Sequence, residues 1–373
     1  MEELEFSVPY NDCPEILPEL FRLKERGNNR IREIYLSGPQ EYFGSGRITP
    51  IIKFDEFAEI VDKIHKVGIR VNLLLNSTCE GIDWYSSEVV KSTMEYLSRV
   101  HEELGVEAIT IANPLYVREV RNRFPDIEIC ASVLGDIDCV QRAIIYSKFG
   151  ANVITPDVNI NRDLKLLKQI KDATNVELKL MVNEGCLYKC PLRKFHFNST
   201  SHMSKEVGKV RLPDGTFSMA KEVGEVGLGL SSGGFTGICN KLTSEDPSQV
   251  LKSCWIRPED TKKYSGITSF FKIVGRSQPR SAVIRTTKAY LEESWDGDLL
   301  DILCASLSSF GRIYGAYLDN KTLGRYKFFE KVISCDRNCS QCSYCEELAR
   351  RLIGFGILSQ EKIEDIEWVP STE

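Results

Sequence analysis

The sequence lacks the features that would place it in a membrane or outside the cell. No stretch reaches the roughly 18 consecutive apolar residues of a membrane span. The first residues, Met-Glu-Glu-Leu-Glu, are acidic and lead straight into a predicted strand, which is unlike a signal peptide. There is no internal repeat and no low-complexity tract. We therefore expect a cytoplasmic protein without a membrane span.

The sequence also lacks a strong excess of either positive or negative charge. The formal net charge is −5, with 42% apolar and 27% charged residues among 373. This balance supports a full core and a polar surface, and it gives no overall attraction to nucleic acid. The length suits one large α/β barrel with an extension.

Histidine is rare, with four in the chain, and no serine–histidine–acid arrangement stands out. His65 and His101 fall on predicted helices and are expected at the surface. His196 and His202 follow Cys190 closely, so a role in metal binding, acid–base chemistry or substrate contact is open for both.

Cysteine, in contrast, is abundant, with 13 residues. Without a signal peptide, thiolate-bound metal fits better than a disulfide framework. We expect five isolated cysteines to be ordinary core or surface residues: Cys13, Cys79, Cys130, Cys139 and Cys304.

Short β-branched runs alternate with amphipathic helical patterns. The expected strands are residues 4–9, 31–37, 71–76, 108–113, 127–133, 152–156, 176–183 and 269–274. The expected helices are residues 13–26, 54–67, 88–104, 116–124, 136–149, 162–173 and 281–294. Eight strands alternating with helices predict a (β/α)8 TIM-like barrel, with an open doubly wound sheet as the alternative.

The regular spacing breaks after the seventh strand. We assign residues 1–300 to the barrel, with an insertion at about 191–268, and residues 301–373 to a Cys-rich helical extension. The insertion holds an expected turn at Pro213-Asp214-Gly215 and a Gly/Ser-rich stretch at 227–237. So long an insertion is typical of a lid or a binding surface.

Polar residues recur at the expected carboxyl ends of the strands, where a barrel of this kind has its active site. They are Asn11, Asp12, Ser37, Asn76, Asn113, Ser132, Asp157, Asn183, Glu184, Lys272 and Arg276. Helix capping is the simpler explanation for any single Asn or Asp. Arg276 ends Phe-Phe-Lys-Ile-Val-Gly-Arg, and its planar fork suits a carboxylate or phosphate, or else a salt bridge on the rim.

Two groups of cysteines have metal-ligand spacing. Cys186, Cys190, Cys239 and Cys254 form a Cys-x3-Cys-x48-Cys-x14-Cys set at the mouth of the barrel. Four thiolates suit zinc or a four-iron cluster by count, and the irregular spread favours iron–sulfur.

The second group is Cys335, Cys339, Cys342 and Cys345. Its first three members have the Cys-x3-Cys-x2-Cys spacing of radical S-adenosylmethionine enzymes, but they follow the barrel and a fourth thiol is at hand. We expect a closed four-ligand centre, structural or electron-transferring, with a zinc knuckle as the alternative.

The sequence is similar to peptidase family U32, the collagenase-like proteases, over about residues 1–300. The similarity lies in Phe-Lys-Ile-Val-Gly-Arg at 271–276, in the cysteine-bearing segment 182–191, in Ile-Tyr-Leu-Ser-Gly at 34–38 and in Ile-Thr-Pro-Asp at 154–157. The chain departs from the family pattern at Val274, where the family has Glu. The extension is not part of the common core.

The resemblance implies a barrel with a cysteine-bound [4Fe-4S] cluster. It also implies relatives that perform oxygen-independent hydroxylation of ubiquinone precursors or RNA bases, with prephenate as oxygen donor, whereas the older name implies a protease. By position, Cys186, Cys190, Cys239 and Cys254 would bind the cluster, and Lys272 and Arg276 would face substrate.

Three functions are therefore weighed. The first is an iron–sulfur oxidoreductase or hydroxylase acting on a small-molecule, RNA or peptide substrate, with Arg276, Lys272, Glu184 and His196 as catalytic candidates. The second is a peptidase, which needs a nucleophile with a base or a metal-bound water. The third is a non-catalytic iron–sulfur scaffold that works with a biosynthetic or homologous partner.

Overall fold

Eight parallel strands close into a barrel. The computed structural model describes residues 3–39, 43–206, 208–211, 217–219 and 234–355. The strands are β1 (Glu5–Pro9), β3 (Asn29–Ser37), β4 (Arg70–Leu75), β5 (Ala108–Ile111), β6 (Glu128–Ala131), β7 (Val153–Ile154), β8 (Glu177–Met181) and β11 (Phe270–Lys272). They pair in that order, and β1 pairs with both β3 and β11. The predicted (β/α)8 barrel is confirmed, and the open-sheet alternative is wrong.

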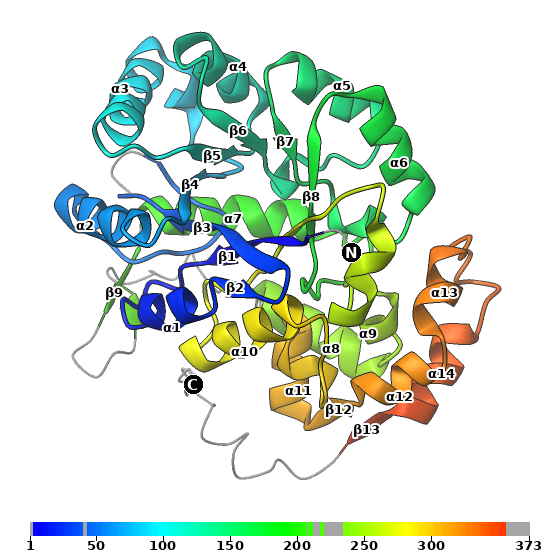
Figure 1. Ribbon diagram of the computed structural model, residues 1–373. Helices are drawn as coiled ribbons and strands as arrows, with labels where there is room; N and C mark the ends of the chain where they lie inside the picture. The colour runs from blue at the N-terminus through cyan, green and yellow to red at the C-terminus, as the bar shows by residue number, and fades with distance from the viewer. Residues whose placement is uncertain (1–2, 40–42, 207, 212–216, 220–233, 356–373) are drawn as a thin grey trace.

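Helices surround this barrel (Figure 1). They are α1 (Ile16–Arg22), α2 (Phe54–His65), α3 (Ser87–Ser98), α4 (Pro114–Arg123), α5 (Val140–Lys148), α6 (Leu164–Ala173) and α10 (Arg280–Leu291). Each lies within or beside a segment expected to be helical, because the apolar spacing marks the buried face. A short β2 (Glu25–Arg26) pairs antiparallel with β3. Within the ranges described, every helix is too short or too polar to cross a bilayer.

Several strand-end residues cap the next helical turn, as the capping alternative predicts. Asn113 accepts from the Leu115 N–H at the start of α4. Ser132 and Asp157 do the same for the short 3₁₀ turns η3 (Val133–Gly135) and η4 (Val158–Ile160). These side chains therefore hold in place the loops at the carboxyl ends of the barrel strands.

The insertion after β8 is largely helical where it is described. It contains α7 (Arg193–Glu206), β9 (Lys209–Arg211), β10 (Phe217–Met219), α8 (Gly234–Glu245), α9 (Gln249–Lys252) and η6 (Pro258–Tyr264). The turn expected at Pro213-Asp214-Gly215 and residues 227–233 of the Gly/Ser-rich stretch lie outside the described residues. The α7 helix lies over the barrel mouth, because Phe197 lines the cavity there together with strand-end residues.

The C-terminal extension packs onto the barrel. Its elements are η7 (Leu299–Asp301), α11 (Ser306–Tyr314), β12 (Ala316–Leu318), α12 (Asn320–Arg325), α13 (Phe328–Ile333), α14 (Tyr344–Leu352) and β13 (Ile353–Phe355). Figure 1 shows α11 to α14 gathered with α8 and α9 on one side of the barrel. Phe328 and Leu348 belong to the same buried apolar cluster as barrel residues such as Phe6.

One contact of the extension with the barrel is especially close. A Cβ at Gly185, just after β8, would lie 2.6 Å from Leu307 Cγ and 2.7 Å from the Cys304 carbonyl oxygen. The Cys304 N–H also donates to the Asn183 carbonyl. The extension therefore lies directly against the segment that carries Cys186.

Candidate functional site at the barrel mouth

A cavity of about 60 Å³ lies at the carboxyl ends of the strands. Its lining includes Tyr35, Arg47, Glu184, Lys272 and Arg276. Three of these were predicted from the sequence as site residues, and the barrel brings them together from strands far apart in the chain. The cavity combines several cations with one carboxylate, which is a polar environment suited to an anionic substrate group.

Arg276 lies buried in this cavity, with 8% of its surface exposed. Its guanidinium donates to the hydroxyls of Ser37 and Ser45, which are neutral groups. Burial lowers the pKa of Arg276, and Asp12 is its neighbour of opposite charge. Two neutral hydroxyls hold the fork in place without neutralising it, so it can still bind an anion.

Lys272 is the second buried cation of the cavity. Its Nζ lies 3.9 Å from the centre of the Tyr35 ring. Burial, together with the charges of Lys179 and Arg276, lowers the pKa of Lys272 to about 7. An amine that titrates near neutral pH can both accept and donate a proton.

Glu184 is buried and ion-paired at the edge of the cavity. Its carboxylate lies 3.1 Å from the Arg193 guanidinium and 4.0 Å from that of Arg47. Burial alone would raise the pKa of Glu184, but these two arginines hold it below its usual value. Its other near neighbour is Cys186, whose thiol lies 3.6 Å away and donates to the carboxylate.

Three of the four cysteines predicted at the barrel mouth are neighbours of one another, and one of them, Cys186, also contacts Glu184. Burial and Glu184 raise the pKa of the Cys186 thiol to about 12. The Cys239 thiol donates to the sulfur of Cys190, which lowers the pKa of Cys190 to about 6 and raises that of Cys239. Cys186 is also an electrostatic neighbour of Cys239. Soft sulfur donors in this number suit zinc or iron–sulfur centres.

The fourth predicted rim ligand, Cys254, faces another way. Its neighbour Ser253 donates to the Cys186 carbonyl, so the two backbones are close. The Cys254 sulfur, however, lies 3.5 Å from the Arg337 guanidinium and lines a second cavity with cysteines of the extension. Across the described residues, no group of three or more His, Cys, Asp or Glu side chains is arranged so that it could hold a metal ion.

His196 lies on α7 near the cavity. Its ring stacks on Phe197 at 5.5 Å and on Phe235 at 5.0 Å. Burial and the nearby Arg47 and Arg193 lower the pKa of His196 to about 4, so the ring is neutral at physiological pH. The other two histidines with described hydrogen bonds, His65 and His101, pair with Glu107 and Asp126.

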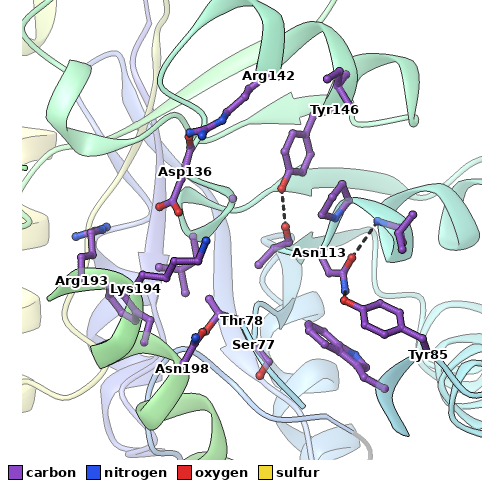
Figure 2. Close-up of a pocket in the computed structure, with 18 residues that line it drawn as sticks. Ser77, Thr78, Tyr85, Asn113, Asp136, Arg142, Tyr146, Arg193, Lys194 and Asn198 are labelled. Carbon is purple, nitrogen blue, oxygen red and sulfur yellow. Dashed lines mark hydrogen bonds between the residues drawn. The ribbon is translucent and has the colours of Figure 1, made fainter. Parts of the chain in front are cut away.

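A larger pocket of about 540 Å³ opens beside the mouth. Leu134 and Phe197 line both spaces, so the two adjoin. Figure 2 shows Asp136 and Arg142 on one side, with Lys194 of α7 pointing toward Asp136. Asp136 adopts a left-handed backbone conformation with φ of 51° where it ends the turn η3, a conformation that Asp tolerates well.

The opposite side of this pocket is aromatic. Asn113 donates to the Tyr85 hydroxyl at 2.8 Å, and Tyr146 donates to the Ala112 carbonyl (Figure 2). Trp84 stacks on Tyr116 beneath them, with ring centres 5.6 Å apart. A flat ring could lie against these side chains while the cations of α7 contact a charged group.

Comparisons with known proteins agree with the motif evidence. The family model described as "Peptidase family U32" matches residues 19–199. A Methanocaldococcus jannaschii protein named "Uncharacterized protease MJ1657" is 30% identical over 327 residues, covering 86% of this chain and 88% of that protein. The chain belongs to peptidase family U32. The structure of the U32 peptidase Mk0906 is also similar, at 22% identity and a TM-score of 0.46, over 55% of this chain and 78% of that one.

Several residues of this U32 barrel were not predicted from the sequence. Glu33 of β3 and Lys179 of β8 meet inside the barrel at 2.8 Å, both with fully buried side chains. Glu33 also accepts from Ser7 and Asn72. The strand pattern held a signal, because a charged residue within a buried strand points inward and needs a partner.

Arg193 and Arg47 were missed for another reason. Both lie outside the strands, in α7 and in the loop after β3. Only the folded chain brings them to Glu184. Cys304, expected to be an ordinary core residue, is buried as predicted but lines the mouth cavity.

Proposed function

We propose that this U32 protein is a cytoplasmic iron–sulfur enzyme whose cluster is held at the barrel mouth by Cys186, Cys190 and Cys239. The observation that carries the proposal is that the Cys239 thiol has both Cys190 and Cys186 as neighbours. The Cys186 thiol also donates to Glu184, which lines the cationic cavity. Three thiolates leave one position of a four-iron cluster without a cysteine. Cys254, the fourth ligand expected from the sequence, points away from these three thiols and lines a separate cavity.

The residues of the mouth suit a redox modification such as oxygen-independent hydroxylation. A bound cluster would supply one-electron transfer at this place. Arg276 would bind and orient an anionic group, since its fork is held by neutral hydroxyls. Lys272, with its pKa lowered to about 7, would hold or release a proton.

The two adjoining spaces support a reaction between two bound molecules. One carboxylate group of a donor such as prephenate matches the mouth cavity in charge, and a cavity of about 60 Å³ admits such a group rather than the whole molecule. The larger pocket, with Trp84, Tyr85 and Lys194, suits a flat ring that carries negative charge. A biosynthetic aromatic compound or an RNA base has this chemistry.

A peptidase is the second candidate, favoured by the name of the M. jannaschii relative. Cys190 could serve as its nucleophile, because its thiol is the one with a lowered pKa. The base is the weak point, since His196 stacks between two phenyl rings. A non-catalytic scaffold is supported less, because it gives no reason to bury Arg276 and Lys272 in one cavity.

One comparison separates the two enzymes. Protein purified without oxygen should contain iron and sulfide, give an electron paramagnetic signal on reduction, and leave unfolded casein and gelatin intact. Cys190→Ala should abolish the signal of the rim cluster. Hydrolysis by iron-free protein that disappears in Cys190→Ala would instead establish the peptidase and overturn the proposal.

A further inference from the structure

Four cysteines from distant parts of the chain line one small cavity beneath the extension. Its volume is about 40 Å³, and its lining includes Cys254, Cys335, Cys339 and Cys345. Cys254 comes from the insertion, whereas the other three come from the segment around the start of α14. Cys342 is exposed, as Cys335 and Cys339 also are, but it is not among the residues that line this cavity.

Arg337 connects the two sources of cysteine. Its backbone N–H donates to the Cys335 sulfur at 3.3 Å. Its guanidinium donates to the Cys254 sulfur at 3.5 Å and to the Asn159 carbonyl at 3.2 Å. The cysteine-bearing loop is therefore in direct contact with Cys254 and with the top of the barrel.

A buried arginine beside the cavity lacks a carboxylate partner in the part of the chain that the structure describes, so an anion bound there would stabilise it. Arg162 is 4% exposed and donates only to backbone carbonyls, those of Leu251 and Trp255, among the hydrogen bonds described for it. Its guanidinium also stacks 4.6 Å from the Trp255 ring. Within residues 3–39, 43–206, 208–211, 217–219 and 234–355, no ion pair joins Arg162 to a carboxylate. A buried cation without a counter-charge is costly.

The sulfur atoms supply the missing charge. Cys254 and Cys345 are electrostatic neighbours of Arg162, and Cys335 and Cys339 are neighbours of Cys345. Four thiolates around a divalent metal or a cluster carry net negative charge, and their tetrahedral arrangement suits zinc or iron–sulfur. Two guanidiniums, those of Arg162 and Arg337, would offset that charge.

We propose that Cys254, Cys335, Cys339 and Cys345 bind one thiolate-ligated metal centre that joins the extension to the barrel, with Cys342 outside the ligand set. This assignment moves Cys254 away from the rim set and replaces Cys342, which the sequence spacing would choose. It does not depend on a cluster at the rim.

The test isolates this centre in the full-length chain. In a background of Cys186→Ala, Cys190→Ala and Cys239→Ala, any remaining metal belongs to the second site. Metal and sulfide are counted after purification without oxygen: one zinc, or about four irons with sulfide. Either metal is consistent with the ligand set.

Two further substitutions decide the ligands. Cys254→Ala should lose the metal in this background, and Cys342→Ala should keep it. Cys130→Ala is the matched control for truncating a buried cysteine, because Cys130 is fully buried in the barrel. In the otherwise unchanged chain, Cys254→Ala should lower the total metal by the same amount, whereas Cys342→Ala and Cys130→Ala should leave it unchanged.

Cobalt gives a second readout. Co²⁺ loaded into the background protein should show the charge-transfer absorbance of four thiolates, unchanged in Cys342→Ala and lower in Cys254→Ala. Loss of metal in Cys342→Ala, its retention in Cys254→Ala, or a metal-free background protein would overturn the proposal. Absence of iron from the rim would contradict the proposed function and leave this result untouched.

Discussion

Lys272 offers a sharp test of the electrostatics of the barrel mouth. Its pKa falls from the ordinary 10.5 to about 7 because the amine is buried near Lys179 and Arg276. Between these two values, the unfolded chain binds a proton that the folded chain does not. The free energy of unfolding should therefore rise with pH in this window, by at most about 1.4 kcal/mol per pH unit. The full difference of 3.5 units corresponds to about 5 kcal/mol.

The Lys272→Met variant should lack this contribution. We expect urea unfolding at pH 7.5 and 9.5 to show that the wild-type protein gains roughly 2.7 kcal/mol more than the variant over these two units. Because the two proteins are compared at the same pH, the contributions of all other titrating groups to the free energy of unfolding cancel. Lys168→Met is the control, because Lys168 is 62% exposed and pairs only with Asp172 on the surface. An identical pH dependence in wild type and Lys272→Met would refute the reasoning.

Three other substitutions test separate parts of the structure. Lys179→Met should lower the free energy of unfolding in urea by about 3–5 kcal/mol, because Glu33 is left as an unpaired buried charge. Adding Glu33→Gln should recover much of this stability, and no recovery would contradict a direct ion pair between the two residues. Gly185→Ala should make the extension sensitive to limited proteolysis, because the added Cβ would clash with Leu307 and Cys304. Gly354→Ala should have no such effect, because a Cβ there meets open space. Equal sensitivity of the two variants would argue against the close contact at Gly185. Arg276→Lys should weaken prephenate binding roughly tenfold, as measured by calorimetry, because the planar guanidinium and its charge-assisted hydrogen bonds are lost. An unchanged affinity would show that Arg276 does not bind this ligand.

The barrel itself was predictable from the sequence. Apolar runs such as Ile-Tyr-Leu at 34–36 and Leu-Leu-Leu at 73–75 have the length of buried strands, and Gly or Pro marks most helix ends. The structure confirms all eight strands. Glu184, Lys272 and Arg276 line one cavity in the structure, because the carboxyl ends of parallel strands share one edge, and their catalytic role stays a prediction.

The insertion and the extension were less predictable. The helix α7 within the insertion was not among the helices expected from the sequence, because its apolar pattern is weak and tertiary packing stabilises it. Strand β12 pairs with β13 across three intervening helices, and local sequence carries no signal for such a pairing.

The grouping of the cysteines also could not be read from spacing. Spacing along the chain assigned Cys254 to the rim and Cys342 to the extension. In the fold, the direction of the Cys254 side chain and the position of Arg337 bring Cys254 to Cys335 and Cys345 instead. Ligand sets that combine distant segments depend on side-chain direction, which a sequence pattern does not contain.

The most direct test of the whole account is the iron and acid-labile sulfide content of protein purified without oxygen, compared between wild type and Cys186→Ala. If thiolates hold a cluster at the barrel mouth, this one substitution should remove about four irons per chain and a matching amount of sulfide. A wild-type protein that turns over its substrate without iron, or an iron content unchanged by Cys186→Ala, would contradict the central claim.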